Sequence, residues 1–216
     1  MVYYAQGNYS EALEYYFKSL DISIKVLGAE HKDVANSYNS IGNVYYAQGN
    51  YSEALVLYLK VLEIYKKVLG DEHINVAIIY NNIGVVNCKQ DNYPEALEYY
   101  LKALEIYKKV LGDEHINVAM FYNNIGNVYG YQGNLSETLK YYLRSLEIYK
   151  KVLGDEHIET ADLYNNMGKV YYVQGLYSEA LECFSKAEAV FSKIYGEEHE
   201  MVQQLRESIQ EIKNLL

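Results

Sequence analysis

The chain has 216 residues, of which half are hydrophobic, and its formal net charge is −10 at pH 7. This composition supplies enough apolar material for a core, and the acidic balance disfavours nucleic acid as a partner. No apolar run reaches membrane-spanning length, and the first ten residues lack the basic start and apolar core of a signal peptide. The two cysteines, Cys88 and Cys183, lack disulfide or metal spacing, which suits a reducing compartment. We therefore expect a cytoplasmic protein that does not bind membranes.

A 42-residue repeat runs through the chain. The thirteen letters LEIYKKVLGDEHI occur at 62–74, 104–116 and 146–158. Every histidine obeys the same shift, and so does the glycine three residues before each one. With one proline and no linker-like stretch, we predict a single body over residues 1–216. Its predicted parts are a partial repeat at 1–32, repeats at 33–74, 75–116, 117–158 and 159–199, and a capping helix at 200–216.

Each repeat is predicted to form two helices, as the copy at 75–116 illustrates. Val76, Tyr80 and Ile83 follow helical spacing up to Gln90-Asp91-Asn92, where the four other copies have a helix-ending Gln-Gly. Asn92 then caps a second helix that is apolar over most of its circumference and should be buried on two sides. In chain order we predict helices at 9–27, 33–48, 51–69, 75–90, 93–111, 117–132, 135–153, 159–174, 177–195 and 200–214.

Small residues recur where the two helices of a repeat cross. The first helices carry Gly42, Gly84, Gly126 and Gly168, and the second helices carry Ala54, Ala96, Thr138 and Ala180. A side chain at a glycine position would push the pair apart. The tyrosines at core spacing, Tyr15, Tyr58, Tyr100 and Tyr142, are interpreted as packing residues. The predicted fold class is all-α, with tandem antiparallel helix hairpins stacked into a superhelical solenoid of about five repeats.

These residues resemble the tetratricopeptide repeat. Tyr38, Ile41, Gly42 and Tyr45, followed by Ala54 and Tyr58, match its signature of aromatic, apolar and small positions. The unit is longer than the standard repeat of about 34 residues. Its Leu-Gly-x-x-His loop and the Tyr-Asn-Asn-Ile-Gly at 80–84 and 122–126 are similar to the repeats of kinesin light chains. That family usually has His-Pro in the loop, where this sequence reads His-Lys, His-Ile or His-Glu. The heptads that join kinesin light chains to the motor are absent from the sequence, so membership of a motor complex is not implied.

The resemblance implies that a partner binds on the concave surface lined by the first helices. Asparagine recurs there although it is a poor helix former, and its amide can pair with the backbone of an extended peptide. For the second asparagine of each Asn-Asn pair (Asn82, Asn124, Asn166), the alternative is a hydrogen bond that holds neighbouring repeats together. Cys88 and Gly130 share this face. The predicted peptide-binding residues are Asn39, Asn43, Tyr46, Asn81, Val85, Asn123, Asn127, Asn165, Lys169 and Tyr172.

The charge of this surface limits the kinds of ligand that can bind it. Only Lys89 and Lys169 contribute positive charge to it, which is too little for the carboxylate clamp of chaperone-binding relatives. The basic groove that acidic peptides require is missing for the same reason. We therefore favour a protein or peptide partner that is neutral or basic.

No residue set indicates catalysis. The triplet Asp71-Glu72-His73 contains metal-ligand residue types, but it recurs at every repeat junction and is interpreted as a loop former. No nucleophile–base set or phosphate-binding glycine loop stands apart from the repeat, so we predict no enzyme activity, cofactor or metal. The predicted function is an interaction scaffold that binds an extended peptide. The alternatives are a structural piece that assembles end to end with itself, or a sensor or adaptor segment of a larger signalling protein.

The two ends of the chain are expected to differ. The last helix has one apolar stripe, formed by Met201, Leu205, Ile209, Ile212 and Leu216. Gln210 and Lys213 replace the usual glycine and tyrosine, so the opposite face is polar, as a capping helix requires. Met1 aligns with Asn43, so the first helix is a stub and the chain start is interpreted as a cut. Leu20, Ile22, Ile24 and Leu27 should then lie uncovered. Homo-association through residues 1–27 is the expected consequence.

Overall fold

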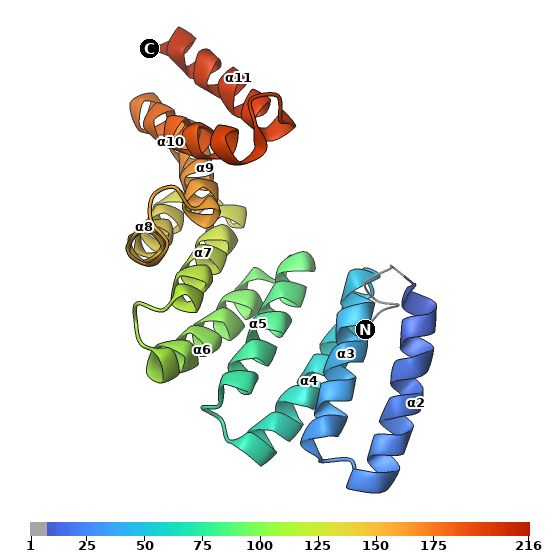
Figure 1. Ribbon diagram of the computed structural model, residues 1–216. Coiled ribbons are helices and arrows are strands. Elements are labelled where there is room, and N and C mark those ends of the chain that lie inside the picture. The colour runs from blue at the N-terminus through green and yellow to red at the C-terminus, as the bar shows by residue number, and fades with distance from the viewer. Residues whose placement is uncertain (1–7) are drawn as a thin grey trace. The chain divides into compact units, whose positions relative to one another are not determined.

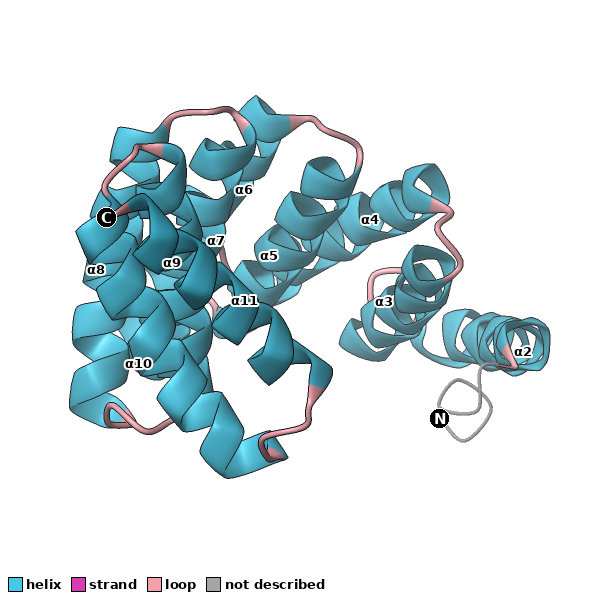
Figure 2. Ribbon diagram, turned by 90° about the horizontal axis from the view of Figure 1, so that it is seen from above, coloured by secondary structure: helices cyan, strands magenta, loops and turns pink. Residues whose placement is uncertain are grey.

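The computed structural model describes residues 8–216, which form ten α-helices joined by short loops (Figure 1). Figure 2 shows helices and loops only, so the all-α prediction is confirmed for this part of the chain. None of the described helices is both long and apolar enough to cross a membrane. Residues 1–7, where the stub was expected, lie outside the described range. The helices are α2 (Tyr9–Leu27), α3 (Lys32–Ala47), α4 (Tyr51–Leu69), α5 (Ile74–Lys89), α6 (Tyr93–Leu111), α7 (Ile116–Tyr131), α8 (Leu135–Val152), α9 (Ile158–Val173), α10 (Tyr177–Tyr195) and α11 (Glu200–Leu215).

The helices α3, α5, α7 and α9 begin one residue earlier than predicted, because a loop histidine is the N-cap residue of each, although the His157 side chain makes no capping bond. His73 Nδ1 accepts a hydrogen bond from the backbone N–H of Asn75 at 3.1 Å. His31, His115 and His199 make the same bond to the residue two positions on. A side-chain acceptor at this position satisfies one of the free N–H groups of the first turn. The sequence interpretation assigned these histidines to a loop and missed the cap.

The other two members of the loop triplet are fixed by lysines. Lys66 Nζ lies 3.0 Å from Asp71 Oδ1, and Lys109 of the next second helix pairs with Glu72. The triplet therefore closes one repeat against the next, which supports its interpretation as a loop former. Within the described residues, no group of three or more His, Cys, Asp or Glu side chains could hold a metal ion.

The small residues lie at the helix crossings, as predicted. A Cβ atom added to Gly42 would lie 2.8 Å from the ring of Tyr58, and one added to Gly126 would lie 2.6 Å from the ring of Tyr142. Real Cβ atoms do not approach a neighbour so closely. Thr138 is fully buried at the alanine position, where its hydroxyl donates to the Asn134 carbonyl at 2.9 Å. Each hairpin is thus closed by a ring packed directly on a glycine backbone.

The chain divides into two compact units, Met1–Val110 and Leu111–Leu216. In the first unit α2 packs on α3, α3 on α4, and α4 on α5. In the second unit α7 packs on α8, α8 on α9, α9 on α10, and α10 on α11. Each unit has its own core of fully buried large side chains. These include Ile41, Ile79 and Ile83 in the first unit and Phe121, Leu163 and Phe191 in the second.

The last helix, α11, has one buried and one exposed face. Val202, Leu205 and Ile212 are buried, whereas Gln210 and Lys213 are exposed as predicted. Met201 and Ile209 are half-buried. The predicted stripe is wrong at its end, because the helix stops at Leu215 and leaves Leu216 exposed.

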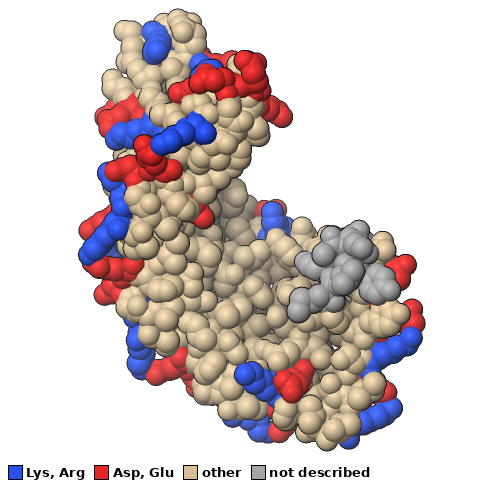
Figure 3. Space-filling model, in the orientation of Figure 1, with Lys and Arg blue, Asp and Glu red and all other residues tan. Residues whose placement is uncertain are grey.

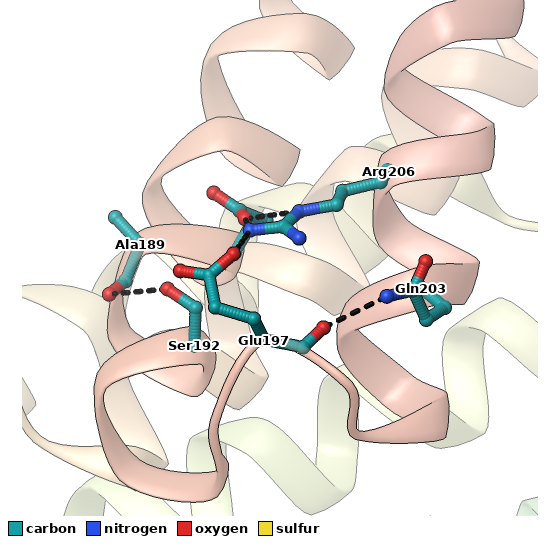
Figure 4. Close-up of polar contacts among 6 residues, drawn as sticks. Ala189, Ser192, Glu197, Gln203 and Arg206 are labelled. Carbon is teal, nitrogen blue, oxygen red and sulfur yellow. Dashed lines mark hydrogen bonds and ion pairs between the residues drawn. The ribbon is translucent and has the colours of Figure 1, made fainter.

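Polar contacts fasten α11 to α10 (Figure 4). The Arg206 guanidinium binds the Glu188 carboxylate at 2.7 Å and also pairs with Glu197 in the preceding loop. Gln203 Nε2 donates to the Glu197 carbonyl at 2.8 Å. Arg206 stands where the other copies have tyrosine, so an ionic clamp replaces an aromatic contact at this position.

In α2, the first described helix, the burial of two side chains differs from the prediction. Leu20 is buried although it was expected to lie uncovered, since α2 packs on α3. Tyr15 is exposed rather than a packing residue, because Tyr16 is the residue that aligns with Tyr58 in the 42-residue register. Ile22 and Leu27 are exposed as expected, and Ile24 is half-buried.

Candidate peptide-binding face

The first helices carry what we call the asparagine face: Asn39, Asn43 and Asn81 in the first unit, and Asn123, Asn127 and Asn165 in the second. In the first unit this face borders a cavity of about 200 Å³ between α3 and α5, lined by Asn43, Tyr46, Tyr58, Asn82 and Val85. None of the lining side chains is charged. The visible face of the first unit is largely uncharged as well, with most Lys, Arg, Asp and Glu along its margins (Figure 3).

Three of the five lining residues were predicted as peptide-binding: Asn43, Tyr46 and Val85. Tyr58 was interpreted as a packing residue, and Asn82 was left open between the peptide-binding face and a hydrogen bond that holds neighbouring repeats together. Asn82 Nδ2 does donate to Asn39 Oδ1 at 3.4 Å, which joins α5 to α3. The second asparagine of this pair therefore both links two repeats and lines the cavity.

Tyrosine hydroxyls fix two of the asparagines. Tyr58 donates to Asn43 Oδ1 at 2.7 Å, and in the second unit Tyr142 donates to Asn127 Oδ1. Because each asparagine uses its oxygen for this bond, its NH₂ group keeps donors for another acceptor. The structure thus holds the Asn43 and Asn127 amides in one orientation.

Asn81 and Asn123 carry hydrogen-bonding capacity that the fold leaves unused. In each, Oδ1 is buried and has no hydrogen-bond partner among the described residues. An unsatisfied buried acceptor costs about 1–3 kcal/mol. Both side chains are half-buried, and an amide that turns about its Cβ–Cγ bond exchanges its oxygen with its nitrogen. Because each Oδ1 is shielded from solvent, a ligand can use this acceptor only if the amide turns and brings the oxygen to its exposed side.

The asparagine face of the second unit is more polar. Lys169 is exposed at the position that Val85 holds in the first unit, and Asn165 beside it is half-buried. The Tyr172 hydroxyl donates to Glu211 of α11 at 2.5 Å, and its ring centre lies 5.7 Å from that of Tyr177. Tyr172 is thus tied to α11 as well as being a predicted binding residue.

Sequence reasoning missed the acidic groups on this face. Asp162 lies one helical turn before Asn165, and its pKa is raised by burial and then by the Glu159 carboxylate, while Lys169 acts in the opposite direction. Asp162 occupies the register position of Asn36, so an alignment of the repeats could have identified it. Together with Glu211, it makes the face of the second unit partly acidic.

The cysteines are unsuited to act as nucleophiles. Cys183 is buried in α10, and this burial raises its pKa to about 11. Cys88 is half-buried, and its pKa is also raised by burial. Because the thiolate is the reactive form, both thiols are protonated and weakly reactive near neutral pH.

Comparisons with known proteins identify the repeat family and the fold. The family model described as Tetratricopeptide repeat matches residues 1–67, 35–109, 75–137, 117–193 and 159–202. No match was found among curated proteins.

Three solved structures show the fold. BtubC (BKLC) from P. vanneervenii is 18% identical, with a TM-score of 0.76 over 96% of this chain and 81% of that one. A putative kinesin light chain from Podosopora anserina with nearly identical TPR-like repeats is 24% identical, with a TM-score of 0.76 over 89% of this chain and 92% of that one. A single-residue variant of that Podosopora anserina protein is 24% identical and has a TM-score of 0.77 over 89% of this chain and 91% of that one.

The family match runs from residue 1 to residue 202, and the structure places the signature glycines, alanines and tyrosines at the helix crossings. The repeats have the lengthened form that is similar to kinesin-light-chain repeats. The chain belongs to the tetratricopeptide repeat family.

Proposed function

We propose that this tetratricopeptide array is an interaction scaffold whose asparagine face binds a segment of a partner protein as an extended peptide. The observation that carries the proposal is the unused hydrogen-bonding capacity of Asn81 and Asn123. We assign the protein no catalytic role and place it in the cytoplasm.

The asparagines suit recognition of a peptide backbone. An extended peptide presents N–H and C=O groups at regular intervals, and an asparagine amide can donate to one and accept from the other. The NH₂ groups of Asn43 and Asn127 add donors of fixed orientation, since tyrosines hold their oxygens. Backbone contacts of this kind give affinity without reading the side chains of the peptide.

The cavity and the charges favour a neutral or basic partner. The cavity beside Asn43 and Val85 has no charged lining and suits one uncharged side chain. In the second unit Asp162 and Glu211 favour a lysine or arginine over an acidic residue. We therefore expect the bound segment to contain an uncharged side chain for the first unit and a basic one for the second.

Alanine substitution of the asparagine face tests the proposal. Proteins captured from the source cell by the wild-type chain are compared by mass spectrometry with those captured by the Asn81→Ala, Asn123→Ala, Asn165→Ala triple variant. The helical spectrum should be unchanged, since alanine is the better helix former. We expect at least one partner to be lost from the triple variant.

The matched control changes the exposed Glu63, Glu105 and Glu147 of the second helices to glutamine. This control variant should capture the same partners as the wild type. If every partner survives the alanine substitutions, or if the glutamine control loses the same partners, the assignment of the face is wrong.

One observation favours self-association as a second function. Ile22 of α2 is 61% exposed, whereas its equivalents Ile64, Ile106 and Ile148 are 6–8% exposed. Val26 is 73% exposed on the same helix. An exposed apolar surface of this kind is typical of an interface. A second copy of the chain, paired through α2, would cover it.

Light scattering as a function of concentration separates the two functions. A self-assembling chain increases in mass with concentration, and the Ile22→Lys, Ile24→Lys variant should return it to the monomer mass of 25.0 kDa. A mass that stays at the monomer value over the whole range excludes self-association through α2. It would leave peptide binding as the proposed function.

A further inference from the structure

The second unit contains a cavity that the peptide-binding proposal does not use. Its volume is about 320 Å³, and it lies between α8, the loop that follows α8, α9 and α10. None of the predicted peptide-binding residues lines it. The lining residues are Lys150, Asp155, Glu156, Tyr164, Lys186, Ala189, Val190 and Lys193.

Three lysines share this cavity with two carboxylates. Lys150 Nζ lies 3.1 Å from Asp155 and also interacts electrostatically with Tyr164. Lys193 Nζ lies 2.5 Å from Glu156. Lys186 lies 5.0 Å from the centre of the Tyr164 ring, and its carboxylate partner is Glu182, which is not part of the lining. An ammonium group has three donors, so each lysine can bind a further acceptor.

The repeat supplies an internal comparison for this cavity. The equivalent cavity of the first unit is about 210 Å³ and is lined by Asp71, Glu72, Tyr80, Lys102, Glu105, Ile106 and Lys109. There, Lys102 and Lys109 share the lining with three carboxylates, and Lys66, the equivalent of Lys150, lies 3.0 Å from Asp71. In the second unit Ala189 stands in the place of Glu105, and Val190 in the place of Ile106. Both replacements put a smaller side chain in the lining of the cavity. The replacement of Glu105 by Ala189 also removes a negative charge.

We propose that the cavity of the second unit binds a phosphate monoester. Lys150, Lys186 and Lys193 supply three ammonium groups around one space, which Tyr164 also lines. A carboxylate offers two oxygens to such a set, whereas a phosphate monoester offers three and carries nearly two charges at neutral pH. The methyl groups of Ala189 and Val190 provide an apolar wall for the carbon chain that carries the phosphate. In the first unit Glu105 supplies a negative charge that would repel such a ligand.

The environment of the lysines sets the strength of binding. All three are partly exposed to solvent, and each is already paired with a carboxylate. Partly exposed charges are screened by water and salt. We therefore expect a dissociation constant on the order of 1 mM for phosphate alone, and weaker binding as the salt concentration rises.

The test is an NMR titration of the full chain with inorganic phosphate at pH 7.5. Backbone amide signals of residues 154–157 and 186–193 should shift with one saturating curve, and those of the first-unit cavity should not. Ala189→Glu restores the carboxylate found in the first unit and should weaken binding at least about tenfold. Lys186→Gln should have a similar effect. The matched control Lys102→Gln changes the equivalent lysine of the first unit and should leave phosphate affinity unchanged.

Two further titrations identify the chemistry and the source of the phosphate. Acetate should bind at least about tenfold more weakly than phosphate, because it offers fewer oxygens and less charge. Tighter binding of a phosphoserine peptide than of free phosphoserine would indicate a phosphorylated protein, and the reverse order a small metabolite. The proposal is overturned if acetate binds as well as phosphate, if Ala189→Glu binds like the wild type, or if Lys102→Gln weakens binding as much as Lys186→Gln. None of these outcomes bears on the asparagine face, since the two sites share no residue.

Discussion

Gly126 and Gly130 lie one turn apart on α7, yet only the second has room for a side chain. A Cβ on Gly126 would lie 2.6 Å from the Tyr142 ring and 3.3 Å from the Thr138 carbonyl oxygen. A Cβ on Gly130 would make an ordinary contact with Thr138 at 3.5 Å. We expect Gly126→Ala to lower the free energy of unfolding by about 1–3 kcal/mol. Gly130→Ala should leave it unchanged or raise it by up to about 1 kcal/mol, because alanine is the better helix former. Urea denaturation measures both, and equal effects at the two positions would contradict the packing described here.

Asp162 gives a stability effect that depends on pH. Asp162 keeps an exposed surface, but partial desolvation of its carboxyl group, and then the Glu159 carboxylate, raise its pKa above the ordinary value of 3.8. The ionised carboxylate is therefore less favourable in the folded chain than in the unfolded one, and its destabilising effect grows as pH rises above 3.8. We expect Asp162→Asn to melt at a higher temperature than the wild type at pH 7. The difference should shrink as the pH falls towards about 3.5. A lower melting temperature at pH 7, or a difference that does not change with pH, would show that the carboxylate is not destabilised.

Single residues were predicted well where the repeat specified them. The crossing glycines and Asn43, Tyr46 and Val85 follow from helical spacing, because residues three or four apart share a face. The capping role of His73 was missed, since histidine is not among the usual capping residues. The buried oxygens of Asn81 and Asn123 could not be predicted, because they depend on how neighbouring helices pack.

At the scale of the helix, Asp91 is the one described residue other than glycine with a positive φ, at 60°. The equivalent positions Gly49, Gly133 and Gly175 have φ between 74° and 78°. The Tyr93 hydroxyl donates to Asp91 Oδ1 at 2.8 Å and partly offsets the strain. We expect Asp91→Gly to raise the free energy of unfolding by about 0.5–1 kcal/mol, since glycine adopts this conformation without steric cost. The reverse change, Gly133→Asp, should lower it. A loss of stability in Asp91→Gly would mean that the tyrosine contact outweighs the strain.

The helices themselves could be predicted almost completely from the sequence. Predicted and observed limits agree at both ends for α2, α4, α6 and α10. Glycine marks the turns beside these helices, except before α6, where Asp91 holds the glycine position. The four full first helices are displaced by one residue because the histidine cap was not recognised. Burial within α2 was predicted less well, as Leu20 shows, because a contact with α3 is a tertiary property.

At the scale of the whole molecule, the repeat makes each copy a control for the others. The family and the fold class follow from the period and the signature residues. The larger size of the second-unit cavity does not, since its lining differs from that of the first-unit cavity by Ala189 in place of Glu105 and Val190 in place of Ile106. The partner is likewise not specified by the repeat, because backbone hydrogen bonds to asparagine select little sequence.

The side-chain amide signals of asparagine test the proposed function most directly. A captured partner, or the segment of it that binds, is titrated into the ¹⁵N-labelled chain, and the NH₂ signals are followed by NMR. We predict that those of Asn39, Asn81, Asn123 and Asn165 shift with a common saturation curve. Those of Asn50 and Asn134, which precede the second helices α4 and α8, should not move. Shifts at Asn50 and Asn134 with none at the four predicted asparagines would contradict binding at the asparagine face.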